Sequence, residues 1–496
     1  MNRSEILDRV KKHSKPWDIV VIGGGATGVG CAVDAAARGL SVLLLEQHDF
    51  GKGTSSRSTK LVHGGVRYLA QGNISLVREA LKERGLLLKN APHVVHKQAF
   101  IVPCYSLWKK IFYGTGLKLY DLLSGKYSFG RSKILSSKET LDHLPNINNT
   151  GLSGGVLYYE GQFDDTRLLI DLVTTAYAHG AALLNYAKVI AIQKDKNGKA
   201  ARVDFENSEN DEKFEIAAKV IINATGAFCD SVRKMSESNA ENIVTQSQGI
   251  HLVFGRKFLS SESALLIPKT SDGRVLFVIP WHGHTLVGTT DTPVETAELE
   301  PKALQTEIDF ILDTAVKYLE KPPKREDILS VFAGIRPLVK SSNTKNTARL
   351  SRGHMIVIDN SGLLTITGGK WTTYRRMAED AVDHAINIGG LTPRPSVTSG
   401  LKILCVETQE PDGEKLHPDL LYTHADIIRA VRDEMACTVE DVLARRTRAL
   451  FLNTKAAIEI AETVAEIMAL ELDKDEEWKT SQVTQFLTVA QSYRIN

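Results

Sequence analysis

The sequence predicts an α/β fold in which a parallel sheet covered by helices is joined to a β-rich domain and a C-terminal helical domain. Three observations support this prediction. Residues 18–46 run as a short apolar strand, a glycine-rich turn, an alanine-rich helix and a second strand. Residues 249–340 contain short apolar strands separated by turns. Beyond the proline-bearing linker LTPRPS, the patterns are those of amphipathic helices.

The first of these segments forms a βαβ unit. Strands are predicted over Asp18–Ile22 and Ser41–Leu45, and a helix over Ala26–Arg38 that stops at Gly39. Strand, helix and strand within about thirty residues imply a right-handed connection and a parallel sheet. The fold class follows from this unit.

Further elements follow along the chain. An Asn197-Gly198 turn predicts a hairpin between strands. The predicted strands are Leu183–Lys194, Ala201–Glu206 and Lys219–Ala224, and the predicted helices are Ile74–Asn90, Asp165–His179, Leu304–Leu319 and Thr372–Ile388. A chain of 496 residues exceeds one ordinary core, so several domains are expected. We expect a discontinuous nucleotide-binding domain from residues 16–100, 150–245 and 345–390, a β-rich domain from 101–149 and 246–344, and a C-terminal helical domain from 391–496.

Composition excludes several classes of protein. The chain is 43% hydrophobic and 24% charged, as in soluble globular proteins. A net charge of +2 gives no general attraction to nucleic acid, and no nucleic-acid partner is predicted. The residues before Trp17 lack the apolar centre of a signal peptide, and no apolar run is long enough to span a bilayer. The protein is therefore predicted not to cross a membrane, although it can lie on one.

The cysteines predict neither a disulfide framework nor a metal site. There are five, at positions 31, 104, 229, 405 and 437, and none forms a CxxC pair. Zinc sites and disulfide-rich domains need regular cysteine spacing. A reducing, cytoplasmic environment fits this pattern best.

The turn after the first strand predicts a dinucleotide site. Gly23-Gly24-Gly25-Ala26-Thr27-Gly28 fits the GxGxxG pattern, whose glycines allow a tight turn, close approach of the pyrophosphate and packing of helix on strand. The pyrophosphate then lies at the helix N-terminus. Glu46, at the end of the second strand, is placed to accept both ribose hydroxyls.

Two features favour FAD over NAD. No second GxGxxG lies in the middle of the chain, so no separate nicotinamide domain is predicted. Near the other end, a strand runs into Gly368-Gly369-Lys370, which opens the helix Thr372–Ile388. The N-terminus of that helix can stabilise the negative charge of reduced flavin at N1 and O2, a charge that NAD does not develop. A Rossmann-like FAD domain of the glutathione-reductase or amine-oxidase type is predicted.

Residues 54–68, TSSRSTKLVHGGVRY, concentrate hydroxyls, glycines and cations after the second strand. Hydroxyls and backbone N–H groups suit a diphosphate, whereas His63, Arg67 and Tyr68 suit a group beyond it. A solvated basic loop with a tyrosine anchor is the alternative.

Particular stretches follow one another in order across about residues 18–380. They are IGGGATGVG, TSSRSTKLVHGGVRYL, QFDDTRL, INATGAFCDSV, QGIHLVF, VIPWHGHTLVGTTDT, FAGIRPLV and TGGKWTTYRRMAEDA. Through these stretches the sequence resembles a known family, the FAD-dependent glycerol-3-phosphate dehydrogenases, and DEMACTVEDVLARRTR resembles the family's helical cap.

The resemblance implies a reaction and a set of cofactor contacts. In glycerol metabolism, sn-glycerol 3-phosphate is oxidised to dihydroxyacetone phosphate, with hydride passing from C2 to flavin N5 and electrons to quinone. FAD is bound without a covalent bond. Its predicted contacts are Gly23, Gly24, Gly25, Thr27, Gly28, Glu46, Thr54, Ser55, Ser58, Lys60, Leu61, His63, Gly64, Gly65, Val189, Ala224, Thr225, Gly226, Gly369, Lys370 and Thr372.

Oxidation of this substrate needs a phosphate clamp and a base. For the clamp we predict Arg67 and Arg336, with Lys370 and the Tyr68 hydroxyl beside them, because guanidinium groups match phosphate bidentately. For the base, His251 and His63 are the alternatives, since histidine titrates near neutrality. Arg336 is also predicted to be catalytic, by steadying the developing alkoxide.

Three weaker features are predicted to be structural. In QFDDTRL, an N-cap followed by an ion pair is expected from Asp164, Asp165 and Arg167, with a proton-transferring acid pair as the alternative. Asp291 is expected to be a turn residue that contacts the substrate loop. Cys31 is expected in the core.

The segment Trp108–Leu123 is basic, aromatic and apolar. It can lie in a bilayer interface beside a quinone, or it can cap the β-rich domain. The resemblance implies a peripheral membrane enzyme on the cytoplasmic face of the inner membrane. A glycerol-3-phosphate oxidase using oxygen, an FAD amino-acid oxidase or dehydrogenase, and a non-catalytic FAD-binding module stay open as alternatives, as does a homodimer.

Overall fold

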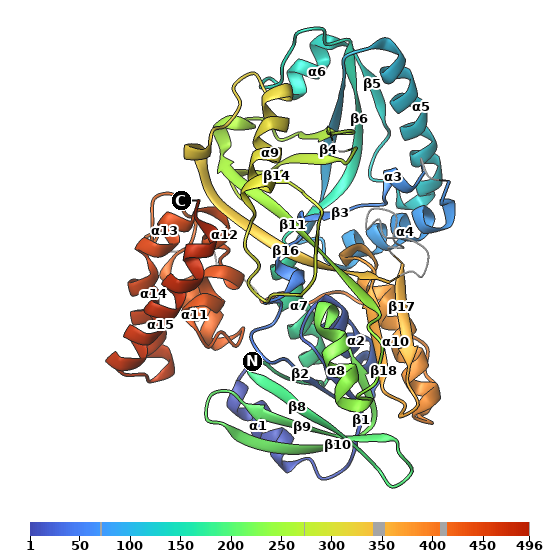
Figure 1. Ribbon diagram of the computed structural model, residues 1–496, viewed down its shortest axis with the longest axis vertical. Helices are drawn as coiled ribbons and strands as arrows, with labels where there is room; N and C mark the ends of the chain where they lie inside the picture. The colour runs from blue at the N-terminus through green and yellow to red at the C-terminus, as the bar shows by residue number, and fades with distance from the viewer. Residues whose placement is uncertain (70–71, 272, 341–352, 407–413, 496) are drawn as a thin grey trace.

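The computed structural model describes residues 1–496 except 70–71, 272, 341–352, 407–413 and 496. Figure 1 shows two sheet-containing parts stacked along the long axis, with the C-terminal helices at one side of them. The predicted α/β class, with a β-rich part and a C-terminal helical part, is confirmed.

The first sheet is built around the predicted βαβ unit. β1 (Trp17–Ile22) lies between β2 (Val42–Leu45) and β10 (Glu212–Asn223), parallel to both. Ile19 and Val21 are fully buried, as expected for a parallel sheet covered on both faces. The strand order is β17-β18-β10-β1-β2-β7, completed by β17 (His354–Ile358), β18 (Leu364–Gly368) and β7 (Ala182–Leu184). The helices α2 (Ala26–Ala37), α7 (Asp165–Ala178) and α10 (Tyr374–Ile388) belong to this part.

An antiparallel hairpin extends the first sheet. β8 (Ala187–Lys194) pairs with β9 (Ala200–Asn207), which pairs with β10, and Gly198 has a φ of +77° in the predicted turn. The single strand predicted over Leu183–Lys194 is wrong in one respect. Tyr186 has a φ of +53°, which ends β7 and starts β8 in a new direction.

The second sheet carries the β-rich part. Its order is β15-β11-β14-β13-β12-β4-β6-β3, with β16 beside β11 and β5 beside β6. β11 (Val244–Gly255) and β16 (Ile328–Val339) are antiparallel, and the register places Phe332 opposite His251 and Arg336 opposite Ser247. The other strands are β3 (Leu61–Val62), β4 (Val95–Cys104), β5 (Lys133–Leu135), β6 (Gly154–Phe163), β12 (Ala264–Ile267), β13 (Leu276–Trp281), β14 (His284–Gly288) and β15 (Thr292–Val294).

The sheets do not follow the boundaries predicted at residues 100 and 150. β4 runs through residue 100, and both β4 and β6 pair within the second sheet rather than the first. Two long paired strands cannot be divided between domains without breaking their ladder. We propose that the β-rich domain includes β3, β4 and β6, with the other predicted divisions kept.

The remaining helices include the predicted ones at positions 74–90 and 304–319. They are α1 (Arg3–Lys12), α3 (Val66–Leu69), α4 (Ile74–Asn90), α5 (Leu107–Ser124), α6 (Ser137–His143), α8 (Cys229–Ser236) and α9 (Gln305–Tyr318). The helix predicted from Thr372 opens with a 3-10 turn over Trp371–Thr373. Of the helices that the structure describes, none is both long and apolar enough to cross a membrane.

The C-terminal helices pack on the second sheet. Their apolar side chains share one core with β11 and β16, in which Phe451 lies 4.9 Å from Phe332 between ring centroids. They are α11 (His424–Arg432), a π-helical turn (Asp441–Arg446), α12 (Ala449–Leu452), α13 (Thr454–Glu459), α14 (Ala461–Leu472) and α15 (Glu476–Ala490).

Candidate active site

A cavity of about 1620 Å³ lies between the two sheets. Its wall includes the glycine turn after β1, the turn after β18, the facing parts of β11 and β16, and much of α5. Pockets for drug-sized ligands have volumes of about 300–1,000 Å³. The cavity therefore has room for a dinucleotide and a small substrate together.

The first glycine turn is so closely packed that side chains would not fit at two of its positions. A Cβ on Gly24 would meet Glu46 Cβ at 2.8 Å, and one on Gly28 would collide with the carbonyl of Gly23. Glu46 lines the cavity and accepts hydrogen bonds from Gly24 N at 2.6 Å and His48 N at 2.9 Å. Burial raises the pKa of Glu46. These features fit the adenosine and pyrophosphate of FAD.

A second glycine turn reaches the same cavity from far along the chain. Gly368 and Gly369 have φ values of +77° and +69°, and a Cβ on Gly369 would collide with Met377. Lys370 and Thr372, which follow this turn at the start of the 3-10 segment and α10, line the cavity. The first turn, which predicted a dinucleotide, and the second turn, which favoured FAD over NAD, therefore face one space.

Most of the predicted cofactor contacts line this cavity. Gly24, Gly28, Gly64 and Lys60 do not. The two glycines of the first turn act through packing, and Gly64 lies against Tyr120 and Leu81. The prediction that the Lys60 side chain contacts the cofactor is wrong. This side chain is fully buried in an ion pair with Asp165, with Nζ 2.6 Å from Oδ2. Those that line the cavity are Gly23, Gly25, Thr27, Glu46, Thr54, Ser55, Ser58, Leu61, His63, Gly65, Val189, Ala224, Thr225, Gly226, Gly369, Lys370 and Thr372.

Arg336 enters the cavity from β16. Its Nη2 donates to Thr289 Oγ1 and to the Thr290 carbonyl, both at 2.9 Å, and its Nη1 donates to the Gln248 carbonyl at 3.3 Å. A Cβ on Gly249 would collide with the guanidinium, so the glycine in QGIHLVF makes room for it. The charge is thus held in a fixed position at the cavity wall.

His251 lines the same cavity from β11, the strand that pairs with the strand of Arg336. Its ring stacks on Phe332 with centroids 4.9 Å apart, and its Nε2 is 2.9 Å from Thr59 Oγ1. Burial, together with the Lys60 and Arg336 cations, lowers the pKa of His251 well below its usual value. Gly288 on β14 has no side chain because a Cβ there would collide with the imidazole.

Fewer contacts are described for the other predicted substrate and catalytic residues. His63 is half-buried, lines the cavity, and donates its backbone N–H to Thr372 Oγ1 at 3.2 Å. Lys370 lines the cavity beside the second glycine turn. Arg67 and Tyr68 lie in α3, but their side chains fall outside the described residues. The cavity thus brings together Arg336, His251, His63 and Lys370.

The predicted N-cap and ion pair of QFDDTRL and the core position of Cys31 are confirmed. Asp291 contacts side chains of β11 and β16, and its predicted contact with the substrate loop stays a prediction. Asp164 caps α7 by accepting from the backbone N–H groups of Thr166 and Arg167 at 3.0 Å. Arg167 pairs with Glu434, Nη1 to Oε1 2.8 Å. Asp291 accepts a hydrogen bond from Ser247 and lies 3.7 Å from Arg336 Nη1. Cys31 is fully buried in the core.

A buried charge cluster behind the cavity was not predicted. Asp165 accepts from Lys60 Nζ and from Ser58 Oγ, at 2.6 and 2.7 Å, and lies 3.4 Å from Arg448 Nη2. Lys60 also lies 5.0 Å from the centre of the Phe332 ring. Burial lowers the pKa of Lys60 to about 7, against the opposing effect of Asp165. The cluster fixes the backbone that carries Thr59.

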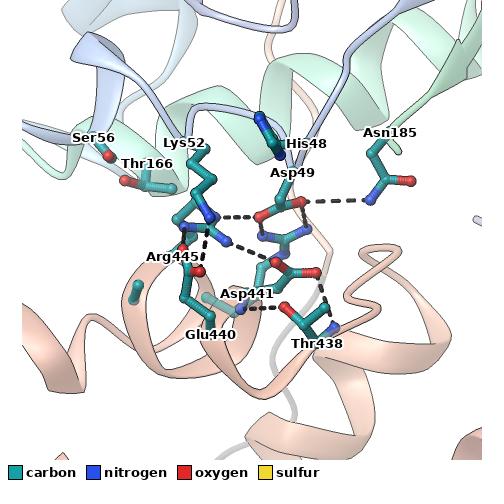
Figure 2. Close-up of polar contacts among 12 residues, drawn as sticks. His48, Asp49, Lys52, Ser56, Thr166, Asn185, Thr438, Glu440, Asp441 and Arg445 are labelled. Carbon is teal, nitrogen blue, oxygen red and sulfur yellow. Dashed lines mark hydrogen bonds and ion pairs between the residues drawn. The ribbon is translucent and has the colours of Figure 1, made fainter. Parts of the chain in front are cut away.

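A second cluster ties the C-terminal unit to the loop after β2 (Figure 2). Asp49 accepts from Arg446 through two bonds of 2.7 and 2.9 Å, and also from Arg445. Glu440 pairs with Lys52 at 2.8 Å and with Arg445 at 2.7 Å. Arg445 and Arg446, predicted only as part of a helical cap, therefore bind the loop after β2. The sequence feature that could have predicted this role is the presence of three arginines in an otherwise largely apolar segment.

One face of α5 is apolar and exposed. Trp108, Phe112 and Leu122 are 80%, 69% and 77% exposed, while Leu117 and Tyr120 on the opposite side are buried. Trp108 and Phe112 also line the cavity. Figure 1 shows α5 along the outer edge of the second sheet, away from the C-terminal helices. The cavity therefore extends to the exposed apolar face.

Comparison with known proteins decides the family. Residues 18–375 match the FAD dependent oxidoreductase family, and residues 399–479 match the C-terminal domain of alpha-glycerophosphate oxidase. A probable mitochondrial glycerol-3-phosphate dehydrogenase of Caenorhabditis elegans is 39% identical, over 95% of this chain and 72% of its own length. The chain belongs to the FAD-dependent glycerol-3-phosphate dehydrogenase family. The mitochondrial enzyme of Arabidopsis thaliana is 38% identical, over 97% of this chain and 86% of its own.

Solved structures agree with membership of this family. The FAD complex of a glycerol-3-phosphate dehydrogenase from Bacillus halodurans superposes with a TM-score of 0.79 at 29% identity, covering 99% of this chain and 97% of that one. A glycine oxidase from Geobacillus kaustophilus, at 16% identity and a TM-score of 0.56, shares the fold over 80% of this chain. The protein is an FAD-dependent oxidoreductase, and the predictions of its family and cofactor are confirmed.

Proposed function

We propose that the protein oxidises sn-glycerol 3-phosphate to dihydroxyacetone phosphate in the cavity between the two sheets. The observation that carries this proposal is the arrangement of Arg336 and His251 on neighbouring strands, in one cavity with the two glycine turns. Bound FAD supplies the acceptor for the hydride that leaves C2. The protein's own residues hold the phosphate, orient C2 and take up the hydroxyl proton.

Arg336 is the centre of the proposed phosphate clamp. A guanidinium held by Thr289 and Thr290 is pre-organised, so little side-chain freedom is lost when phosphate binds. Lys370 adds a second cation on the cavity wall. Each charge-assisted hydrogen bond is worth about 1.5–3 kcal/mol. We propose Arg67 and Tyr68 as further members of the clamp, and the support for them is the resemblance of the sequence to the family.

His251 is the proposed base, with His63 as the alternative. The lowered pKa of His251 keeps its ring neutral at neutral pH, which a base requires. Arg336 lies beside it and stabilises negative charge on the substrate oxygen as the proton leaves. His63 lies nearer the second glycine turn, because its backbone contacts Thr372.

We propose that the electrons pass to a membrane quinone. The exposed apolar face of α5 and its continuity with the cavity support this proposal, because a lipid-soluble acceptor held in a bilayer can reach the cavity along that face. Lys109 is exposed at the start of α5 and suits anionic headgroups. The protein then lies on the cytoplasmic face of the inner membrane.

Two outcomes compete with this proposal. Proteins of similar fold include a glycine oxidase, and a guanidinium binds an amino-acid carboxylate as well as a phosphate. The similarity to glycerol-3-phosphate dehydrogenases supports the phosphate ester as the substrate. A glycerophosphate oxidase from Mycoplasma pneumoniae also shares the fold, at 18% identity and a TM-score of 0.60. Oxygen is therefore the rival electron acceptor.

Steady-state assays separate these outcomes. Oxidation of glycerol 3-phosphate is measured with a short-chain quinone analogue and, separately, with oxygen and peroxide detection. We expect rapid turnover with the quinone, little peroxide, and no turnover of unphosphorylated glycerol. Peroxide formed as fast as substrate is consumed would indicate an oxidase. Turnover of glycerol as fast as glycerol 3-phosphate would contradict the proposed phosphate clamp.

A further inference from the structure

We propose that Thr59 is a catalytic residue, which passes the proton of the substrate hydroxyl to His251. This inference rests on the proposed oxidation of glycerol 3-phosphate and names the path that the proton takes. It concerns a side chain in the segment TSSRSTKLVHGG that had no assigned role in the sequence.

Thr59 is the hydrogen-bond partner of the His251 imidazole among the described residues. His251 Nδ1 is enclosed and has no hydrogen-bond partner among the described residues. Nε2 lies 2.9 Å from Thr59 Oγ1. One ring face stacks on Phe332, and the ring edge at Cδ2 lies against Gly288. A substrate that uses His251 as its base must therefore reach Nε2, where the Thr59 hydroxyl is already bound.

Thr59 itself is accessible to a ligand. It is half-buried and lines the cavity together with Arg336 and Thr289. A hydroxyl can accept one proton while donating another, so it serves as a relay. An alcohol whose phosphate is held at Arg336 can thus meet Thr59 before it meets His251.

The position of Thr59 is fixed from both sides. Ser58 donates through its backbone N–H and its Oγ to Asp165 Oδ2, at 3.1 and 2.7 Å. Lys60 donates through Nζ to the same oxygen at 2.6 Å. The carboxylate is fully buried. Both neighbours of Thr59 are therefore anchored to one carboxylate, and the hydroxyl is held in place without a reorganisation step.

The proposed step is balanced in protons and electrons. Thr59 Oγ1 gives its proton to His251 Nε2 and takes the proton of the C2 hydroxyl. The C2 hydrogen leaves with the electron pair of its bond, as a hydride that the flavin would accept, and a C2=O double bond forms. The ketone leaves, His251 carries the proton, and Thr59 is again a neutral alcohol.

Charged groups around His251 set the strength of this base. Lys60 and Arg336 lower the pKa of His251 in addition to the effect of burial. Asp165 pairs with Lys60, and Asp291 lies 3.7 Å from Arg336. A phosphate bound to Arg336 offsets that cation, so substrate binding makes the imidazole a stronger base. His63 is the other histidine in the cavity wall.

The first test does not depend on turnover. Nitrogen NMR of protein labelled with ¹⁵N-histidine, with the His251 signals assigned by loss in His251→Gln, reports which ring nitrogen carries the proton. The relay requires Nε2 unprotonated and accepting from Thr59. We expect its signal to shift in Thr59→Val and to stay in place in Thr59→Ser. A protonated Nε2 in the wild-type protein would contradict the relay.

The second test measures flavin reduction by glycerol 3-phosphate in an anaerobic stopped-flow apparatus. Thr59→Val preserves shape and removes the hydroxyl. We expect a loss of about a hundredfold or more, the range for general base catalysis, with FAD content unchanged. Thr59→Ser should keep most of the rate, and Thr480→Val, on the exposed face of α15, controls for a generic threonine change.

The outcomes separate the relay from the proposed function. If the flavin of Thr59→Val is reduced as fast as that of the wild-type protein, the proposed relay is wrong, while the proposed oxidation of glycerol 3-phosphate stands. If wild-type protein is not reduced at all, the proposed function fails first. A loss in Thr59→Val that Thr59→Ser does not rescue would assign Thr59 a packing role instead.

Discussion

Arg446 and Asp49 form a bidentate ion pair between the C-terminal unit and the loop after β2, with Nη1–Oδ2 and Nη2–Oδ1 distances of 2.7 and 2.9 Å. Their side chains are 1% and 0% exposed. The same loop begins at Glu46, the acid expected to bind the FAD ribose. The C-terminal helices thus hold one wall of the cavity in place (Figure 2).

Arg446→Met should therefore weaken FAD retention as well as stability. Removing one partner of a buried ion pair typically lowers the unfolding free energy by about 3–5 kcal/mol. FAD release after dilution, followed by flavin fluorescence, should be faster in this variant. Arg432→Met is the matched control, because Arg432 pairs with Glu471 at the surface and is 63% exposed. Equal FAD release in the two variants would show that the pair does not support the cofactor loop.

Glu440 gives the C-terminal contact a pH dependence. Burial acts to raise the pKa of Glu440, but the Arg445 and Lys52 cations outweigh it and lower the pKa from 4.5 to about 2. Between these values the unfolded chain binds a proton that the folded chain does not. The unfolding free energy should fall as pH drops from 4.5 to 2, by up to about 3 kcal/mol from this group.

Acid unfolding followed by circular dichroism tests this dependence. Glu440→Gln should be less stable at neutral pH and should lose less stability between pH 4.5 and 2 than the wild type. Parallel stability curves for the two proteins in that range would assign the acid sensitivity to other carboxylates.

Arg336→Ala should impair substrate use without loss of cofactor. The KM for glycerol 3-phosphate should rise and kcat should fall by well over tenfold, because the guanidinium binds phosphate and steadies charge on the substrate oxygen. Arg325→Ala, an exposed change just before the same strand, serves as the control. Near-normal kinetics for Arg336→Ala with normal FAD content would remove Arg336 from the site.

The apolar face of α5 should bind lipid. Trp108→Ser with Phe112→Ser should reduce co-sedimentation with anionic vesicles severalfold while leaving reduction of the flavin by substrate intact, because both side chains are exposed. Leu470→Ser removes a side chain that is 85% exposed on α14 and is the matched control. Unchanged vesicle binding in the α5 variant would favour the alternative interpretation, in which this helix only caps the β-rich domain.

Local patterns predicted the parts of the fold that local sequence determines. The βαβ unit around Gly23 was predictable because the turn, the helix and both strands lie within one short segment. The boundaries at residues 100 and 150 were misplaced, because the pairing of β4 with β6 is a long-range contact across α5 and α6. Tyr186 was missed because a residue with positive φ leaves no mark in hydrophobic periodicity.

Most of the predicted site residues line one cavity, but their contacts were only partly predictable. Arg336 and His251 came from motifs and lie on neighbouring strands of one sheet. The family resemblance implied Lys60 as a cofactor contact, yet its cation turns into the core to meet Asp165. Such a pairing joins residues more than a hundred positions apart, which no local pattern reports.

Anaerobic titration of the bound flavin tests the central claim most directly. Stepwise addition of glycerol 3-phosphate should bleach the oxidised flavin spectrum, whereas glycine and proline should leave it unchanged. Bleaching by an amino acid, or an unchanged spectrum with glycerol 3-phosphate in excess, would contradict the assignment of this cavity to the oxidation of glycerol 3-phosphate.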